Sequence, residues 1–389
     1  MIRTIHGVRP QAPAALALIP SRGDSRSRGR GMIGVDLFAG AGGLSLGAVQ
    51  AGIDVRLAVE ADPHAVMTYQ RNHPKTRVLA YDIRNLQARD LPKDGTGKIL
   101  FGGPPCQGFS TSNQRTRKAD NPSNWLFQEF MRVVKLWQPD WVVLENVKGL
   151  VETADGIFID HITGCLKGLD YTTDWWVLNA ADFGVPQKRW RLFVIGSRNG
   201  KVIPKPSPML TRSKYVTVRH AIGDLPDLAN GASTDRLPYG RRPRSDFARA
   251  MRGPLRECGN NLVTRSARII IKRYANVPPG GNWADIPARL MRNYVDRTRC
   301  HTGIYHRLQF DAPSVVIGNF RKNMLIHPTQ DRGLSAREAA RLQSFPDWYE
   351  FKGSIGFQQQ QVGNAVPPLL AKVVFERIMD GQRGGRPCP

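Results

Sequence analysis

The sequence has few cysteines, no long apolar run and few acidic residues. Its five cysteines are an odd number, lie far apart and include no CxxC pair, which argues against a disulfide framework and a zinc site. No run of about 18 apolar residues occurs, so no membrane-spanning helix is expected. The weakly apolar stretch 12–20 is short, contains proline and precedes an arginine-rich segment, which does not suit a secretory signal. These absences predict a metal-free protein of the reducing cytoplasm.

Basic residues greatly outnumber acidic ones. The 389 residues include 56 Lys and Arg against 32 Asp and Glu, which gives a formal net charge of +24. Arginines occur from Arg3 to Arg386, so a single tail does not account for the excess. Such a charge attracts polyanions, because neutralising phosphates releases condensed counterions. The charge therefore favours a nucleic-acid partner, with a generally basic proteome as the alternative explanation.

Composition divides the chain into five segments. Residues 1–31 are rich in Arg, Gly, Pro and Ser and are expected to be a disordered basic tail, with the natural start at Met1 or Met32. Residues 32–200 and 324–380 have the periodicity of a main domain. Residues 201–323 are rich in Arg, Pro, Gly and Asn, which predicts loops and short strands on a separate lobe. Residues 381–389 form a second tail.

Short apolar runs alternate with helical patterns within 32–200. Alternating βα units predict an α/β fold, with a mainly parallel sheet covered on both faces and ligands beyond the carboxyl ends of its strands. Further along, Ser335 and Glu338 form a capping-box pattern that opens a helix over 335–344, and a last helix is expected over 367–379, ending at Gly381. The expected strands are 33–38, 55–60, 77–80, 99–102, 141–145, 174–179 and 191–196, and the expected helices among them are 44–50, 63–72, 126–136 and 157–169.

A glycine-rich turn (DLFAGAGGL) occupies 36–44, where the first expected strand ends. Glycine lets a backbone approach a ligand and adopt positive φ, although a purely structural turn has the same composition. The second strand ends at Glu60, whose carboxylate can accept both hydroxyls of a ribose. The third ends at Asp82 and Ile83, which offer a hydrogen bond and an apolar contact to an adenine. The pattern predicts a nucleoside-containing cofactor, and the missing Gly-Lys-Ser/Thr ending disfavours a nucleoside triphosphate.

Cys106 lies in the loop 102–110 (GGPPCQGFS) that follows the fourth expected strand. Most single cysteines are small buried apolar residues. Here two prolines stiffen the approach to the thiol, glycines surround it, and the loop lies on the ligand side of the sheet. Such an environment suits an exposed, reactive thiol.

Ionisable residues follow two further strand positions. Glu145 ends the apolar run 141–144, where partial desolvation would raise the pKa of its carboxyl and help it share a proton. An ordinary surface glutamate at a strand end is the alternative. Arg189 and Arg191 lie in the segment 187–191 (QKRWR), and strand alternation places them on one side. Two guanidinium groups there suit a phosphate or a polar base edge, or equally a solvated basic face.

Together these segments resemble the cytosine-5 DNA methyltransferases, in particular those of bacterial restriction-modification systems. The motifs occur in the family's order with compatible spacing, and the resemblance extends from about residue 33 to residue 380. Chance does not explain so many ordered motifs. The matching segments are the cofactor loop 36–47, Glu60, Asp82, Pro105-Cys106-Gln107, Glu145-Asn146-Val147, 187–191 (QKRWR), 337–346 (REAARLQSFP) and 361–368 (QVGNAVPP).

The resemblance implies a Rossmann-like class I methyltransferase fold that binds S-adenosylmethionine and releases S-adenosylhomocysteine. It makes 32–200 and 324–380 the catalytic domain and 201–323 the target-recognition domain. Two residues depart from the pattern: Ala61 stands where an aromatic residue is frequent, and Val316 where a threonine is usual. The implied catalytic residues are Cys106, Glu145, Arg189 and Arg191, and the implied cofactor-binding residues are Phe38, Ala39, Gly40, Gly42, Gly43, Leu44, Glu60, Ala61, Asp82, Ile83, Pro104, Leu126, Asn364 and Val366.

The implied activity is that of a DNA (cytosine-5-)-methyltransferase acting on a cytosine flipped out of a specific duplex sequence, through a Cys106 adduct at carbon 6. Double-stranded DNA is the expected partner of a monomer, with a cognate restriction endonuclease acting separately, or none if the enzyme is an orphan. Three alternatives remain: a tRNA cytosine-5 methyltransferase with the same motifs, a catalytically silent DNA-binding protein, and a nicotinamide oxidoreductase, in which the Pro-Cys loop has no role.

Overall fold

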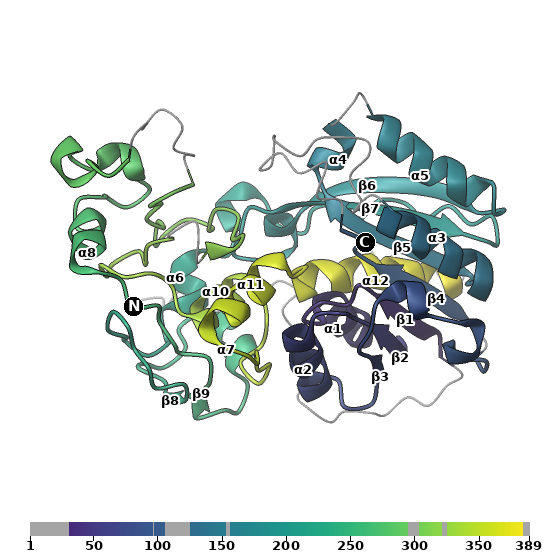
Figure 1. Cartoon of the computed structure of the whole chain (residues 1–389), viewed down its shortest axis with the longest axis horizontal. Coiled ribbons are helices and arrows are strands. Elements are labelled where there is room, and N and C mark those ends of the chain that lie inside the picture. Colours follow the sequence, from purple (N-terminus) through teal and green to yellow (C-terminus); the bar gives the residue numbers. More distant parts are fainter. Residues whose placement is uncertain are drawn as a thin grey trace, which may run out of the picture.

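A computed structural model describes residues 31–95, 97–105, 125–152, 156–294, 303–320 and 325–383. Cys106 and nearly all of the predicted N-terminal tail lie outside these ranges. Two regions are seen in Figure 1, an α/β unit around a sheet and a less regular lobe beside it. No helix among the described residues is long and apolar enough to cross a membrane.

A seven-stranded sheet forms the centre of the α/β unit, in the order β3-β2-β1-β4-β5-β7-β6. The strands from β3 to β5 run parallel, whereas β7 is antiparallel to both of its neighbours. Every strand lies where the sequence predicted one, and the predicted α/β fold with a mainly parallel sheet is confirmed. The bounds are β1 Ile33–Leu37, β2 Asp54–Val59, β3 Arg77–Leu79, β4 Lys98–Gly102, β5 Trp141–Val147, β6 Thr172–Asn179 and β7 Trp190–Ser197.

Helices cover both faces of the sheet, so its central strands are mainly apolar. On β5, Val142 and Leu144 pack into the cluster beneath α3 and α5, while Val143 packs into the cluster on the opposite face with α1 and α12. This alternation follows from the two-residue repeat of a strand. The helices of this unit are α1 Gly43–Gln50, α2 Pro63–Asn72, α3 Trp125–Trp137, α4 Gly149–Glu152, α5 Ile157–Lys167 and α12 Pro368–Arg383.

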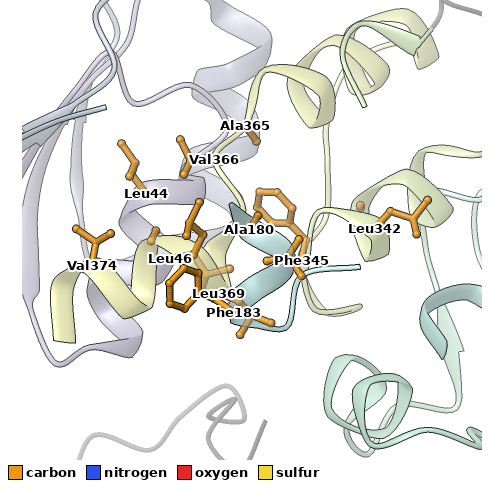
Figure 2. Close-up of a cluster of buried hydrophobic side chains, with 14 of the residues drawn as sticks. Leu44, Leu46, Ala180, Phe183, Leu342, Phe345, Ala365, Val366, Leu369 and Val374 are labelled. Carbon is orange, nitrogen blue, oxygen red and sulfur yellow. The ribbon is translucent and has the colours of Figure 1, made fainter. Parts of the chain in front are cut away.

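The last helix closes the α/β unit by packing on the first. A Cβ atom added to Gly47 would lie 2.5 Å from the Cβ of Ala371, so only glycine permits this approach of α12 to α1. Figure 2 shows Leu44 and Leu46 of α1 beside Val366, Leu369 and Val374 of the C-terminal segment. The sequence predicted that α12 ends at Gly381. That was wrong, since the helix continues to Arg383, because one glycine costs a helix only about 1 kcal/mol.

The second lobe contains short elements and two packed regions. Residues of α6 and α7 join the large core that also contains α10, whereas Tyr274, Ile286 and Tyr305 belong to a small separate core. The sequence predicted short strands here but not the short helices that the described residues form. The elements are α6 Val218–Ile222, β8 Leu237–Pro238, α7 Asp246–Arg252, β9 Glu257–Cys258 and α8 Arg268–Tyr274, followed by α10 Ala336–Leu342 and α11 Ile355–Asn364.

A buried ionic network joins this lobe to α10. The guanidinium of Arg341 is fully buried and binds Asp224, which follows α6, at 2.9 Å and Asp347 at 2.6 Å. Tyr239 donates a further hydrogen bond to Asp347 at 2.6 Å. Because every charge is paired, the network tolerates burial, and loss of one partner would leave an uncompensated charge. At the start of α10, the predicted capping box of Ser335 and Glu338 is confirmed.

Candidate active site

The carboxyl ends of the parallel strands carry most of the predicted site residues. Phe38 follows β1, Glu60 follows β2, Gly103 follows β4, and Glu145 lies near the end of β5. These strands are adjacent and parallel, so their ends meet at one edge of the sheet. The sheet topology thus brings together groups that are more than 100 residues apart in the sequence.

The glycine loop after β1 has an unusual backbone. Phe38 has a φ of 57°, Gly40 of 54° and Gly42 of 84°, all in the left-handed region that favours glycine. A Cβ added to Gly40 would meet no atom within 4 Å, so space is open beside this residue. A Cβ on Gly43 would lie 2.3 Å from the carbonyl oxygen of Val366. The loop is therefore open at Gly40 and tightly packed at Gly43.

Glu60 is held by backbone donors on both of its carboxylate oxygens. Gly40 donates its N–H to Oε2 at 2.7 Å, and Asp62 donates its N–H to Oε1 at 2.8 Å. Each oxygen keeps a further lone pair for a ligand hydroxyl. Ala61 is exposed beside it, and Asp62 caps α2. The ribose carboxylate predicted from the sequence thus has a fixed orientation next to the glycine loop.

An apolar cluster gathers three of the predicted cofactor-binding residues. Ile83 is buried in it, and Phe38 and Leu126 pack against it. Asp82 is bound instead by Arg84, whose guanidinium donates to the two carboxylate oxygens at 2.9 and 2.6 Å. These hydrogen bonds lower the pKa of Asp82 to about 2. Asp82 is therefore ionised and already partnered where the sequence predicted an adenine ligand.

The predicted cofactor residues near the C-terminus lie at the junction of α11 and α12. Asn364 ends α11 and is exposed, while Val366 is buried with its carbonyl against Gly43. The remaining predicted residues of the glycine loop, Ala39 and Leu44, are buried.

Glu145 and Arg191 form a buried ion pair. Arg191 Nε lies 2.8 Å from Glu145 Oε1, and both side chains are about nine-tenths buried. Burial raises the pKa of Glu145, while the positive charges of Arg191 and Arg189 oppose the increase. A carboxyl group whose pKa is raised in this way holds a proton more readily than an exposed one.

The start of the Pro-Cys loop lies directly against this carboxylate. A Cβ atom on Gly103 would be 2.8 Å from Glu145 Oε2. Asn146 donates its side-chain N–H to the carbonyl of Pro104 at 3.1 Å and accepts the N–H of Val147. Asn146 thereby ties the end of β5 to the loop that leads to Cys106, which itself lies outside the described residues.

Arg189 takes a different position from Arg191. Its fully buried guanidinium donates to the carbonyls of Ile317 at 2.7 Å, Gly363 at 2.9 Å and Ala365 at 3.2 Å. Gln187 supports the same junction by accepting the N–H of Ile317 at 3.0 Å. Arg189 thus fastens the segments before α12 to β7. Sequence alternation placed the two arginines on one side but did not reveal this division of tasks.

Comparison with known proteins identifies the family. A model of the family described as C-5 cytosine-specific DNA methylase matches residues 32–380. The chain belongs to this family. It is a DNA (cytosine-5-)-methyltransferase, as the sequence motifs predicted.

Relatives and a solved structure agree with this membership. The chain is 40% identical over 350 residues to Type II methyltransferase M1.HphI of Haemophilus parahaemolyticus, covering 89% of this chain and 86% of the relative. It is 35% identical to M.DdeI of Desulfomicrobium norvegicum, with 88% of each chain covered. A crystal structure of a DNA modification methyltransferase encoded within a prophage of E. coli superimposes with a TM-score of 0.73 at 27% identity, covering 90% of this chain and 99% of that one.

The contact between Gly103 and Glu145 predicts a selective defect in this methyltransferase. In Gly103→Ala the new methyl group displaces the Glu145 carboxylate, so we expect kcat to fall roughly 100-fold, the scale of a 1 Å misplacement. Binding of S-adenosylhomocysteine, measured by calorimetry, should change little. Gly164→Ala in α5 is the control, because a Cβ there meets no atom within 4 Å. Equal turnover by both variants would contradict the predicted catalytic role of Glu145.

Asp36 at the end of β1 predicts a pH-dependent stability. Burial raises the pKa of its carboxyl from 3.8 to about 8, although Ser45 donates a hydrogen bond to it. Between these values the folded chain keeps a proton that the unfolded chain releases, so the free energy of unfolding falls as the pH rises. The buried His73 and His327, with pKa values lowered to about 4, act in the opposite sense, but only below their ordinary 6.5.

From pH 6.5 to 8 these two histidines contribute less, and comparison with Asp36→Asn cancels the contributions of the other titrating groups. Relative to Asp36→Asn, the wild-type chain should lose about 1.5 kcal/mol of unfolding free energy across this window, as urea titrations without cofactor would measure. Asp54→Asn, at an exposed carboxylate, should behave as the wild type. Parallel pH profiles for all three chains would show that Asp36 is ionised in the fold.

Proposed function

We propose that this enzyme transfers the methyl group of S-adenosylmethionine to carbon 5 of a cytosine flipped out of duplex DNA, through a covalent adduct of Cys106. The observation that carries the proposal is the buried pair of Glu145 and Arg191, which lies against the first residues of the Pro-Cys loop. Carbon 5 of cytosine is a weak nucleophile, and a thiol, an acid and a fixed cation at one place are what its activation requires.

The described residues fit an adenosyl cofactor. Glu60 has lone pairs left for the ribose hydroxyls, and the open space at Gly40 permits a close approach to the backbone. The cluster of Phe38, Ile83 and Leu126 offers an apolar surface for adenine. When bound, the cofactor supplies an electrophilic methyl group on a sulfonium. Asp82 pairs with Arg84 at the surface and caps the short helix at Ile83, and we propose that its remaining lone pair accepts a hydrogen bond from adenine.

The protein's own groups perform the remaining chemistry. The Cys106 thiolate forms a bond to carbon 6 of the ring, and the displaced π electrons make carbon 5 nucleophilic. Glu145 binds the ring nitrogen and the exocyclic amine, and its raised pKa suits a proton shared with that nitrogen. Arg191 keeps Glu145 in place and contributes positive charge beside the base. After methylation the carbon 5 proton leaves to a base, the carbon 5–carbon 6 double bond re-forms, and the bond to the Cys106 sulfur breaks.

Arg189 has a positioning role in this scheme. Its contacts with Ile317, Gly363 and Ala365 hold the segment that carries Asn364 and Val366, the two C-terminal cofactor residues. Target recognition is assigned to residues 201–323, whose arginine-rich loops would contact phosphates and base edges. Because carbon 6 is inaccessible inside a duplex, the target base must leave the stack. A cognate restriction endonuclease would act separately on the same DNA sequence.

A labelled methyl-transfer assay on duplex DNA and on tRNA tests the substrate. We expect label in DNA alone, and bisulfite sequencing of DNA from an expressing host would then locate the target sequence. Label in tRNA alone would favour the RNA enzyme with the same motifs. Absence of label in both, with DNA still bound, would favour a silent DNA-binding protein.

A further inference from the structure

We propose that Tyr349 and His73 position the glycine loop for the cofactor by holding its backbone at Ala41 and Gly42. The inference rests on the cofactor site proposed above and assigns a task to two residues that lie outside its expected ligands. Tyr349 follows α10, and His73 is the C-cap of α2, so each comes from a part of the chain remote from the loop.

The Tyr349 hydroxyl is committed to the loop. It is completely buried and donates its hydrogen bond to the carbonyl oxygen of Ala41. Its oxygen lies 3.1 Å from Nε2 of His73. Because the hydroxyl proton is used toward Ala41, the oxygen accepts from His73 when that ring carries its proton on Nε2, and the same ring also forms a hydrogen bond with the backbone of Gly42. In this chain of hydrogen bonds His73 donates to Tyr349, and Tyr349 donates to the Ala41 carbonyl of the loop backbone.

The same two side chains occupy the space beside Gly42. A Cβ atom there would lie 2.7 Å from His73 Nε2 and 2.7 Å from the Tyr349 hydroxyl. Gly42 has a φ of 84° and is the N-cap of α1, and its N–H donates to the carbonyl of Ala39 at 2.9 Å. The pair therefore packs on the residue at which the loop turns into the helix. Only two residues earlier, Gly40 donates to Glu60 and borders the open space.

Simple filling of the core does not require a hydroxyl at this place. A phenylalanine at 349 would fill nearly the same volume and keep the ring contacts with Phe345 and Phe351. It would leave the buried Ala41 carbonyl without the partner that Tyr349 supplies, and the loop would then gain alternative conformations. We therefore expect the affinity for the cofactor to fall and the rate of the chemical step to stay unchanged.

The test compares Tyr349→Phe with Tyr305→Phe in the full-length enzyme. Tyr305 is equally buried, and its hydroxyl accepts from Arg273 in the small core of the second lobe, far from the loop in the fold. Calorimetric titration with S-adenosylhomocysteine should give a Kd raised about tenfold in Tyr349→Phe, the effect of one buried hydrogen bond, and within twofold of the wild type in Tyr305→Phe. The KM for S-adenosylmethionine should rise in parallel, with kcat at saturation unchanged.

A second variant, His73→Phe, keeps an aromatic ring and removes the donor to Tyr349. We expect a smaller rise in Kd and, combined with Tyr349→Phe, little further loss, because both act on one chain of hydrogen bonds. A wild-type Kd in Tyr349→Phe and His73→Phe would overturn the inference, as would an equal rise in Tyr305→Phe. Failure of the wild-type enzyme to bind S-adenosylhomocysteine would instead overturn the proposed cofactor site.

Discussion

Cys106→Ser should lose methyl transfer to DNA completely while keeping its affinity for S-adenosylhomocysteine. A serine hydroxyl is far less ionised than a thiol at neutral pH, so it cannot add to carbon 6 of the ring. The side chain makes no predicted contact with the ribose or adenine positions, and cofactor binding should therefore persist. Incorporation of labelled methyl groups and a calorimetric titration measure the two properties separately.

A DNA duplex with 5-fluorocytosine at the target position sharpens this test. The fluorine replaces the proton that must leave carbon 5, so the adduct with Cys106 cannot resolve and the protein stays attached to DNA. Wild-type enzyme should give a denaturation-resistant complex on an electrophoresis gel, and Cys106→Ser should give none. Cys165→Ser is the matched control, since this thiol lies on α5 and its pKa is raised by burial.

Two outcomes would contradict the nucleophile assignment. One is normal turnover by Cys106→Ser, and the other is a covalent complex that forms in Cys106→Ser but is lost in Cys165→Ser. Because Cys106 lies outside the described residues, the chemistry of the trapped complex is the direct evidence about this residue.

The sheet could be predicted from the sequence because its strands obey a simple physical rule. Strands buried on both faces need continuous apolar runs, and 99–102 and 141–144 are such runs, followed at once by glycine or by Glu145. Parallel topology then places the strand ends at one edge. The sequence alone therefore predicts that the glycine loop, Glu60 and Glu145 lie near one another. The shared edge of the sheet predicts where these groups lie, but it does not predict which of them bind one another.

The remaining parts depend on contacts that local patterns do not encode. Arg189 and Arg191 look equivalent by alternation, yet only Arg191 Nε reaches Glu145, while Arg189 meets carbonyls from residues 317, 363 and 365. Tyr349 and His73 gave no signal either, because their partner is a backbone carbonyl in a distant loop. The short helices of the second lobe have too few turns to show a clear period.

Glu145→Gln should lower kcat by about 100- to 1,000-fold, the range observed when one preorganised group that stabilises a transition state is removed. Glutamine keeps the shape of the side chain but cannot supply a proton to the ring nitrogen at the pH where Glu145 can. The substitution also leaves the buried Arg191 without its counter-ion. The free energy of unfolding should therefore fall as well, by about 3–5 kcal/mol as for other broken buried pairs.

The kinetic and the structural effects of Glu145→Gln can be separated. Below its unfolding temperature the variant should bind S-adenosylhomocysteine like the wild type, since Glu60 and the glycine loop are unchanged, and single-turnover rates at saturating cofactor then report the chemical step alone. Glu152→Gln is the control. Glu152 ends the short helix α4 that follows β5 and pairs with Lys148 at 2.7 Å, but its side chain is half exposed. Turnover in Glu145→Gln close to that of Glu152→Gln would mean that the buried carboxylate holds Arg191 in place and takes no part in activating the base.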